Sequence, residues 1–181
     1  MSIQFPTAQF PEQQTKRFLL RSLTNGDDDA IFALRSNEEV NRFVGRTAAQ
    51  TVADATRFIE DRIRDITTGQ GIYWAIELKS TGKLIGTICY WNLNYTDNSA
   101  EIGYELLPDM QGKGLMLETI TEVIAWGFNQ LNLETISAFP LGGNDRSVNL
   151  LEKNKFSYYE ITDGYLVYKL SRHTWQSNHT T

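Results

Sequence analysis

A short glycine-containing segment, Gln111-Gly112-Lys113-Gly114-Leu115-Met116, has the residue types needed to bind an anion. It follows a run rich in branched and aromatic residues, Glu101 to Leu107, and precedes an amphipathic stretch, so it is expected to join a strand to a helix. Glycines let a ligand approach the backbone, and the free N–H groups and positive dipole of a helix N-terminus favour phosphate. By itself, the segment is equally consistent with a plain turn between strand and helix.

The residues beside the glycines exclude two common phosphate-binding loops. A P-loop requires Gly-Lys-Ser/Thr, but Lys113 is followed by Gly114. The dinucleotide fingerprint Gly-x-Gly-x-x-Gly requires a third glycine where Leu117 stands. A different diphosphate ligand therefore fits the segment better.

Cysteine and histidine chemistry is not expected. The chain contains one cysteine, Cys89, and two histidines, His173 and His179, both in a polar C-terminal stretch that resembles a frayed tail. Neither a zinc site nor a Cys-His nucleophile can be assembled from this set. We therefore expect no metal.

Composition and charge indicate one globular domain. The chain has 181 residues, of which 41% are hydrophobic and 22% charged, and its net charge of −5 argues against nucleic-acid binding. No apolar run approaches the roughly 20 residues that span a bilayer, and the first residues lack the pattern of a signal peptide. We expect a cytoplasmic protein that acts away from membranes.

The elements that must position the loop follow from the periodicity of apolar residues. Residues 1–16 are expected to be extended and loosely attached, 17–171 to form the domain, and 172–181 to be a polar tail. The first expected strand begins at Arg17. The later expected strands cover Ile72–Leu78, Leu84–Trp91, Ala100–Leu107, Thr135–Phe139, Phe156–Ile161 and Tyr165–Leu170. Expected helices cover Asp27–Ser36, a run from Thr51 to Ile66 that opens with a capping box, Gly114–Leu131 and Asn144–Asn154.

The loop resembles the coenzyme A loop of the GCN5-related N-acetyltransferase (GNAT) family, Gln/Arg-x-x-Gly-x-Gly/Ala, through Gln111 and Gly114. Met116 departs from that pattern but looks like the version in the branch that acetylates ribosomal-protein N-termini. Other segments between Arg17 and Leu170 are similar to that branch in its usual order: Tyr73-Trp74-Ala75-Ile76, Gly82-Lys83-Leu84-Ile85-Gly86, Glu101-Ile102-Gly103-Tyr104, and Asn144-Asp145-Arg146-Ser147 with Leu150-Leu151-Glu152-Lys153-Asn154.

The resemblance implies an α+β fold and a cofactor site. The family has a central mixed, mostly antiparallel sheet of six to seven strands flanked by about four helices, with strand four splayed from strand five. The pantetheine arm of acetyl-CoA would lie in that gap, pairing with the backbone around Leu106 and Leu107 and bonding to Asn144. The pyrophosphate would bind the loop through Gln111, Gly112, Lys113, Gly114, Leu115 and Met116.

The reaction implied is transfer of the acetyl group of acetyl-CoA to a primary amine, which requires removal of a proton from the amine. Glu101, which is similar in place to the family's recurrent glutamate, is the expected base. Glu105 shares its strand face by the two-residue period and is the alternative. Either carboxylate is also consistent with a solvated or salt-bridged surface group. Ser147 matches the serine that relatives place near the coenzyme sulfur, and it also suits a plain helix cap set by Asn144.

Phe43, Trp74, Trp91 and Tyr104 are expected to wall the acceptor cleft, although aromatic residues on strands are often core. The acidic balance suits a cationic acceptor, whether a protein N-terminus, a polyamine or an aminoglycoside. The alternatives are acetylation of a small-molecule amine or antibiotic, and a non-catalytic acyl-CoA-binding module. The chain is expected to be a monomer or a homodimer.

One departure from the family concerns the end of the helix Asn144–Asn154. Relatives usually have a glycine before the phenylalanine there, and this chain has Lys155 before Phe156. A left-handed cap at Lys155 would cost a few tenths to about 1 kcal/mol. We therefore expect a slightly altered helix end.

Overall fold

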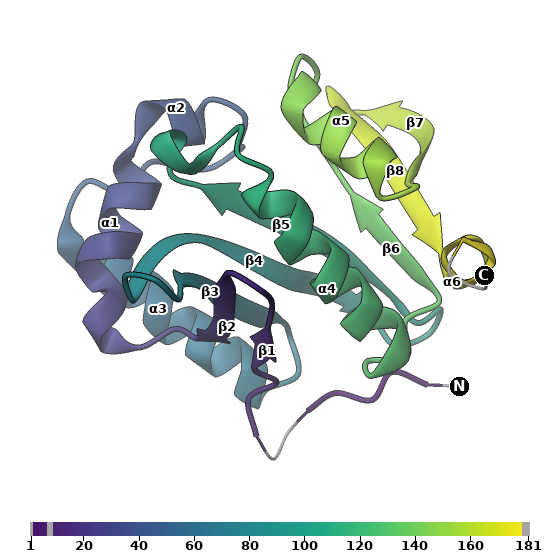
Figure 1. The fold of residues 1–181 in the computed structure, drawn as a ribbon, viewed down its shortest axis with the longest axis horizontal. Helices are drawn as coiled ribbons and strands as arrows, with labels where there is room; N and C mark the ends of the chain where they lie inside the picture. The colour runs from purple at the N-terminus through teal and green to yellow at the C-terminus, as the bar shows by residue number, and fades with distance from the viewer. Residues whose placement is uncertain (1, 7–8, 179–181) are drawn as a thin grey trace.

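The computed structural model describes residues 2–6 and 9–178, which form one mixed sheet with helices on both faces (Figure 1). The sheet has eight strands in the order β1-β2-β3-β4-β5-β6-β8-β7. The strands are β1 (Gln13–Gln14), β2 (Phe18–Ser22), β3 (Ile72–Leu78), β4 (Lys83–Asn94), β5 (Ser99–Leu106), β6 (Thr135–Ala138), β7 (Ser157–Thr162) and β8 (Tyr165–Ser171). The helices are α1 (Asp28–Ser36), α2 (Glu38–Asn41), α3 (Val52–Thr67), α4 (Leu115–Asn129), α5 (Asp145–Lys153) and α6 (Arg172–Ser177), with short 3₁₀ turns η1 (Asn25–Asp27) and η2 (Pro108–Met110).

The expected α+β fold is confirmed, with more elements than the sequence indicated. The additional strand is β1, a two-residue strand that pairs with β2. The additional helices are α2 and α6, which are too short to give a helical period. The expected capping box of α3 is present, since Thr51 N donates to Asp54 Oδ2 over 2.8 Å and Asp54 N donates to Thr51 Oγ1 over 3.3 Å.

The predicted splay lies between β5 and β6, the one parallel pair among the described strands. This pair has three residue pairs, which join Ser99, Ala100 and Glu101 to Thr135, Ile136 and Ser137. β5 continues to Leu106 while paired only with β4, and in Figure 1 it diverges from β6. One edge of β5 is therefore left open beyond Glu101.

The core lies on both faces of the sheet. On the face covered by α4, the Trp74 ring meets Trp126 and Tyr90 edge to face, with ring centroids 5.3 and 6.2 Å apart. The Tyr90 hydroxyl donates to the carbonyl of Val123 over 3.0 Å. A Cβ at Gly127 would collide with that hydroxyl, so glycine is required there for α4 to approach the sheet. On the other face, α1 and α3 pack through a smaller cluster: Leu23, Ile31, Ala55, Ile59, Ala75 and Leu84.

The N-terminal segment is attached to the core rather than loose. Ile3 is 8% exposed and joins the main core, and Phe5 and Phe10 pack against it. The Trp74 indole N–H donates to the carbonyl of Pro11 over 2.7 Å. The expectation of a loosely attached segment was wrong because these apolar residues follow no regular period and pack only through tertiary contacts.

The C-terminal residues also differ from the expected tail over part of their length. Arg172 to Ser177 form α6, which is capped by Ser171, whose Oγ accepts from Thr174 N over 3.1 Å. The ring of Trp175 lies against Phe128 with centroids 5.2 Å apart. His173 lies on this helix, and His179 lies outside the described residues.

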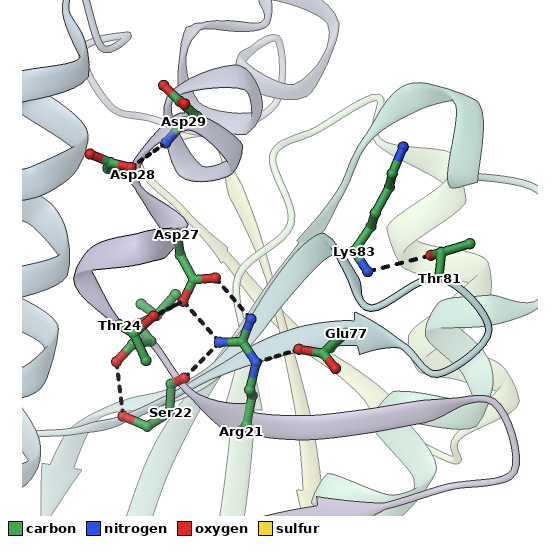
Figure 2. A network of polar contacts seen from close by, with 10 residues as sticks. Arg21, Ser22, Thr24, Asp27, Asp28, Asp29, Glu77, Thr81 and Lys83 are labelled. Atoms are coloured by element: carbon green, nitrogen blue, oxygen red, sulfur yellow. Dashed lines mark hydrogen bonds and ion pairs between the residues drawn. The ribbon is translucent and has the colours of Figure 1, made fainter.

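A buried ion-pair network ties the first strands to α1 (Figure 2). Arg21 on β2 contacts both carboxylate oxygens of Asp27 over 2.8 Å and Glu77 Oε2 on β3 over 2.5 Å. Asp27 is only 6% exposed. Burial would raise the pKa of Asp27, but hydrogen bonds from Arg21 and Thr24 outweigh it and the pKa is lowered. Asp27 therefore stays ionised at neutral pH and completes the arginine pairing.

The end of α5 retains the ordinary left-handed cap despite the lysine. Lys155 has φ +67°, its N–H donates to the carbonyl of Glu152 over 3.0 Å, and Phe156 N donates to the carbonyl of Leu151 over 3.1 Å. These two bonds form a Schellman motif. The expected alteration of the helix end was wrong, because the local hydrogen bonds hold a non-glycine residue in the left-handed region.

The first prediction concerns the network around Arg21. Asp27→Asn should lower the free energy of unfolding by about 2–3 kcal/mol at pH 7, because it leaves a half-buried guanidinium short of its charged partner. Since the folded-state pKa of Asp27 is lowered, its contribution is present above the ordinary carboxyl pKa of about 4 and is lost as pH falls through the lowered value. Urea unfolding at pH 7 and pH 3 should show the difference shrinking in acid. Asp29→Asn on the exposed face of α1 is the control, and an equal effect of both substitutions would contradict the prediction.

The second prediction concerns the cap of α5. Lys155→Gly should raise the free energy of unfolding by roughly 0.5–1 kcal/mol, because glycine adopts a positive φ without steric cost. Lys153→Gly, in the last turn of the same helix, should lower it by a similar amount. Thermal melts of the two variants are expected to shift in opposite directions, and a shift in the same direction would show that the left-handed cap carries no strain.

Candidate active site

The glycine loop forms an open turn at the start of α4. Gly112 and Gly114 have φ values of +72° and +67°, and a Cβ on either would meet nothing within 4 Å. Gly114 is the N-cap of α4 and supplies no side-chain cap, so the first-turn amides lack that partner. Gly112 to Gly114 are exposed, whereas the side chains of Leu115 and Met116 are buried, which leaves those two residues only their backbone to offer. This arrangement fits the diphosphate of coenzyme A.

Side chains hold the loop from both sides. Gln111 Nε2 donates to the carbonyl of Leu106 over 3.0 Å, and Gln111 Oε1 accepts from Arg146 Nη1 on α5 over 2.7 Å. Arg17 Nη2 donates to the carbonyl of Gly114 over 3.1 Å. Gln111 thus links the end of β5 to the start of α5, and its side chain serves the loop rather than facing a ligand directly.

The open edge of β5 starts one residue beyond the last pair with β6. The amide of Leu107 donates to the carbonyl of Ile85 over 2.9 Å. Every second residue of β5, counted back from Leu107, therefore points its backbone N–H and C=O groups to β4. Those of Ile102, Tyr104 and Leu106 point to the opening. The carbonyl of Leu106 already accepts from Gln111. The structure therefore offers Ile102 and Tyr104, more than Leu106 or Leu107, to an added extended chain.

Ser147 and Asn144 come together at the start of α5. Asn144 Oδ1 accepts from the amide of Ser147 over 3.2 Å, which is the helix cap that the sequence indicated. The Ser147 hydroxyl lies 2.8 Å from the Tyr104 hydroxyl on β5. The backbone of Ser147 is therefore part of the helix cap, and its side chain makes a contact across the opening.

Glu101 has the environment of a base. It lies on β5 opposite Trp91, and its Oε1 accepts from Asn92 Nδ2 over 3.0 Å. Asn92 has φ +46° at an irregularity in the β4–β5 pairing, and this backbone turns its amide toward the carboxylate. Burial raises the pKa of Glu101, and the Asn92 hydrogen bond opposes the rise. Among the described residues, Glu101 makes no ion pair.

Glu105, on the same face, has the environment of a structural carboxylate. Its Oε2 lies 2.7 Å from Arg46 Nη2, and its Oε1 accepts from Thr87 Oγ1 over 3.3 Å. Its side chain is 9% exposed. The arginine occupies the oxygen that would receive a proton, so Glu105 is the poorer base of the two.

A pocket of about 160 Å³ lies on this face of the sheet, beneath the loop that joins α2 to α3. Trp91, which is 47% exposed, and Tyr104 are among its lining residues, although the ring of Tyr104 packs against the main core. Burial raises the pKa of the lining thiol, Cys89, to about 12, so that cysteine is a neutral wall residue. The full lining is Val44, Arg46, Tyr73, Thr87, Cys89, Trp91, Gly103, Tyr104 and Glu105.

Two of the expected acceptor contacts do not line the pocket. Trp74 is fully buried on the opposite face of the sheet against Tyr90 and Trp126, so the expectation for Trp74 is corrected to a core role. Phe43 is half-buried next to the lining residue Val44, with the guanidinium of Arg42 5.2 Å from its ring centroid. Trp74 differs because neighbouring strand residues point to opposite faces, and Tyr73 faces the pocket instead.

Sequence reasoning missed Arg46, Asn92 and Tyr73. Tyr73 could be placed by the two-residue strand period, once the pairing of Glu105 with Thr87 shows which face of the sheet carries the pocket. Arg46 and Asn92 follow no period, because a loop and a pairing irregularity position them. Within residues 2–6 and 9–178, no three His, Cys, Asp or Glu side chains are grouped to hold a metal, and no helix is long and apolar enough to cross a bilayer.

Comparisons with known proteins agree with this geometry. The family model described as the acetyltransferase (GNAT) domain matches residues 17–157. An uncharacterised N-acetyltransferase of Bacillus subtilis, YoaA, is 36% identical over 157 residues, which cover 87% of this chain and 89% of the relative.

Two solved structures share the fold at low sequence identity. A ribosomal-protein-S5-alanine acetyltransferase from Vibrio fischeri has a TM-score of 0.75 at 20% identity and covers 91% of this chain and 98% of its own. A spermidine N-acetyltransferase from Vibrio cholerae, solved with CoA and spermine, has a TM-score of 0.77 at 21% identity and covers 90% and 99%. The chain belongs to the GNAT family and is an acetyl-CoA-dependent N-acetyltransferase.

Proposed function

We propose that this protein transfers the acetyl group of acetyl-CoA to the primary amine of a protein N-terminus, with Glu101 as the base and Ser147 as the hydrogen-bond donor to the departing sulfur. The observation that carries the proposal is the contrast between the two glutamates on β5. Glu101 is partly buried with a raised pKa and has no cationic partner within residues 2–6 and 9–178, whereas Glu105 is paired with Arg46. A carboxylate of the first kind is suited to proton transfer near neutral pH.

The cofactor end of the site is the loop Gln111 to Met116 together with Asn144 and the open edge of β5. Acetyl-CoA supplies the acetyl group as an activated thioester. The exposed amides of Gly112 to Gly114 are positioned to bind its diphosphate. The free backbone groups of Ile102 and Tyr104 are suited to pair with the extended pantetheine arm, as one strand pairs with another.

The acceptor end of the site is the pocket that Trp91 and Tyr104 line. An amine entering there lies along the face of β5 that carries Glu101, since Gly103 lines the pocket and Glu101 is two residues away on the same face. Glu101 takes the proton that the amine must lose. Phe43, beside Val44 in the loop above, is placed to contact the rest of an acceptor.

The choice of acceptor class rests on the charges in the pocket. A polyamine carries several cationic nitrogens and needs carboxylates without partners. The one carboxylate that lines the pocket, Glu105, is already paired with Arg46. This favours an acceptor with a single amine at the reacting end, such as a protein N-terminus, and it makes polyamines the second candidate, kept open by the fold shared with a spermidine N-acetyltransferase.

The third prediction tests the function and the base together. Purified protein with acetyl-CoA should release thiol with peptides that have a free N-terminus, and more slowly with spermidine or an aminoglycoside. Glu101→Gln should lower kcat/KM by about 100-fold, because a general base contributes roughly that factor or more. Glu105→Gln is the control. It should not lower kcat/KM to this extent, and its KM for acetyl-CoA should be unchanged. Unchanged turnover in Glu101→Gln would contradict the base, and tight CoA binding without turnover on any amine would support a non-catalytic acyl-CoA-binding module instead.

The fourth prediction concerns pH. Because Glu101 must be ionised to act, kcat/KM should fall as pH drops through its raised pKa. Asn92→Gly removes the hydrogen bond that opposes the rise, so the acid limb of the profile should move to higher pH, with activity reduced on the acid side and retained at alkaline pH. Glycine tolerates the left-handed backbone at this position, so the fold is expected to persist. A profile that does not move, with an unchanged melting temperature, would show that another group controls the acid limb.

A further inference from the structure

The hydroxyls of Tyr104 and Ser147 form a contact across the opening between β5 and β6. Their oxygens are 2.8 Å apart, and the two residues come from different sides, Tyr104 from β5 and Ser147 from the helix that follows β6. Tyr104 lies three residues beyond Glu101, the last β5 residue that pairs with β6. The contact therefore links β5 to the helix that follows β6, beyond the point where backbone hydrogen bonds join β5 to β6.

The position of Tyr104 places this contact between the two ends of the site. Tyr104 lines the acceptor pocket, and its ring packs against the main core. Its backbone groups face the open edge of β5, where the pantetheine arm is proposed to pair. The Asn144 cap fixes the backbone of Ser147, and the contact with Tyr104 holds its Oγ, which leaves the rotation of the hydroxyl proton.

The protonation state of Tyr104 leaves its hydroxyl able to donate a hydrogen bond. Burial raises the pKa of Tyr104 to about 12, so the phenol keeps its proton throughout the neutral range. A neutral phenol has one O–H proton, which it can donate to the serine oxygen. When it donates, the single proton of the Ser147 hydroxyl is free to point elsewhere.

We propose that Tyr104 is a positioning residue that donates to Ser147 Oγ and so directs the Ser147 hydroxyl proton toward the sulfur of the departing coenzyme A. This inference rests on the proposed function. In the transfer, the amine nitrogen bonds to the acetyl carbon as the carbon–sulfur bond breaks, and the electron pair goes to sulfur. The amine proton goes to Glu101, the Ser147 hydrogen bond stabilises the thiolate, and the thiolate takes its proton from water.

A double-mutant cycle on the full-length protein tests the pairing. Tyr104→Phe and Ser147→Ala should each lower kcat by about fivefold to tenfold, near the worth of one hydrogen bond, with KM for acetyl-CoA within about twofold. The double variant should be no slower than the slower single variant, because the tyrosine acts only through the serine. Ser147→Thr, which retains a hydroxyl, should recover part of the rate when Tyr104 is present and none of it in the Tyr104→Phe background.

Tyr168→Phe is the matched control, since it also removes a tyrosine hydroxyl that donates to a side chain. The Tyr168 hydroxyl donates to Glu152 Oε1 over 3.2 Å and does not contact Ser147. It should leave kcat within about twofold. Thiol release is measured with the peptides, spermidine and the aminoglycoside, and with water as the acceptor if no amine reacts.

The outcomes separate the inference from the function on which it rests. Turnover by the wild type with kcat unchanged in Tyr104→Phe overturns the inference and leaves the function standing. Additive losses in the double variant, or a loss confined to KM for the acceptor, overturn it in favour of Tyr104 as a wall of the pocket. Absence of thiol release by the wild type, with water as with amines, overturns both.

Discussion

The site depends on the early end of pairing between β5 and β6. Parallel pairing stops at Glu101 because β6 is only four residues long and the chain turns away at Phe139-Pro140, where proline has no N–H to offer a neighbour. β5 meanwhile continues to Leu106, held by β4. An unpaired strand edge in the middle of a sheet is costly unless something satisfies it, and this edge leads directly to the uncapped amides of the glycine loop. The opening and the loop thus form one continuous surface of backbone donors and acceptors.

Side chains take over where the backbone ladder ends. Side-chain contacts that cross the opening include Tyr104 with Ser147, Gln111 with Arg146, Thr121 on α4 with Asn154 at the end of α5 over 3.0 Å, and Glu39 on α2 with Arg146 over 3.6 Å. These contacts are made by side chains and not by a backbone ladder, and they join α5 to elements on the other side of the opening. Such a connection holds α5 in place without backbone pairing to β5.

The two glutamates on β5 show how environment divides the roles of chemically identical groups. They share a face of one strand, and each meets a residue that strand periodicity does not predict. Arg46 pairs with Glu105 from the loop above, and Asn92 reaches Glu101 from a backbone irregularity in β4. One carboxylate is therefore a neutralised part of the pocket wall, and the other keeps a raised pKa beside a neutral amide. The overall charge of −5 describes the molecule as a whole and not the pocket, where an arginine compensates the one lining carboxylate.

The sequence by itself determined the features that depend on near neighbours. The strand–glycine loop–helix order, the Thr51–Asp54 capping box and the Asn144 cap are determined by residues a few positions apart, and the structure contains each of them. The family motifs, read in order, also predicted the splayed α+β fold. Tertiary structure decided what depends on which distant residues meet: the burial of Trp74, the pairing of Glu105 with Arg46, and the contact of Tyr104 with Ser147. Those contacts join residues tens of positions apart, and they follow from strand register, from the side of the sheet that each residue faces and from loop paths, none of which local spacing encodes.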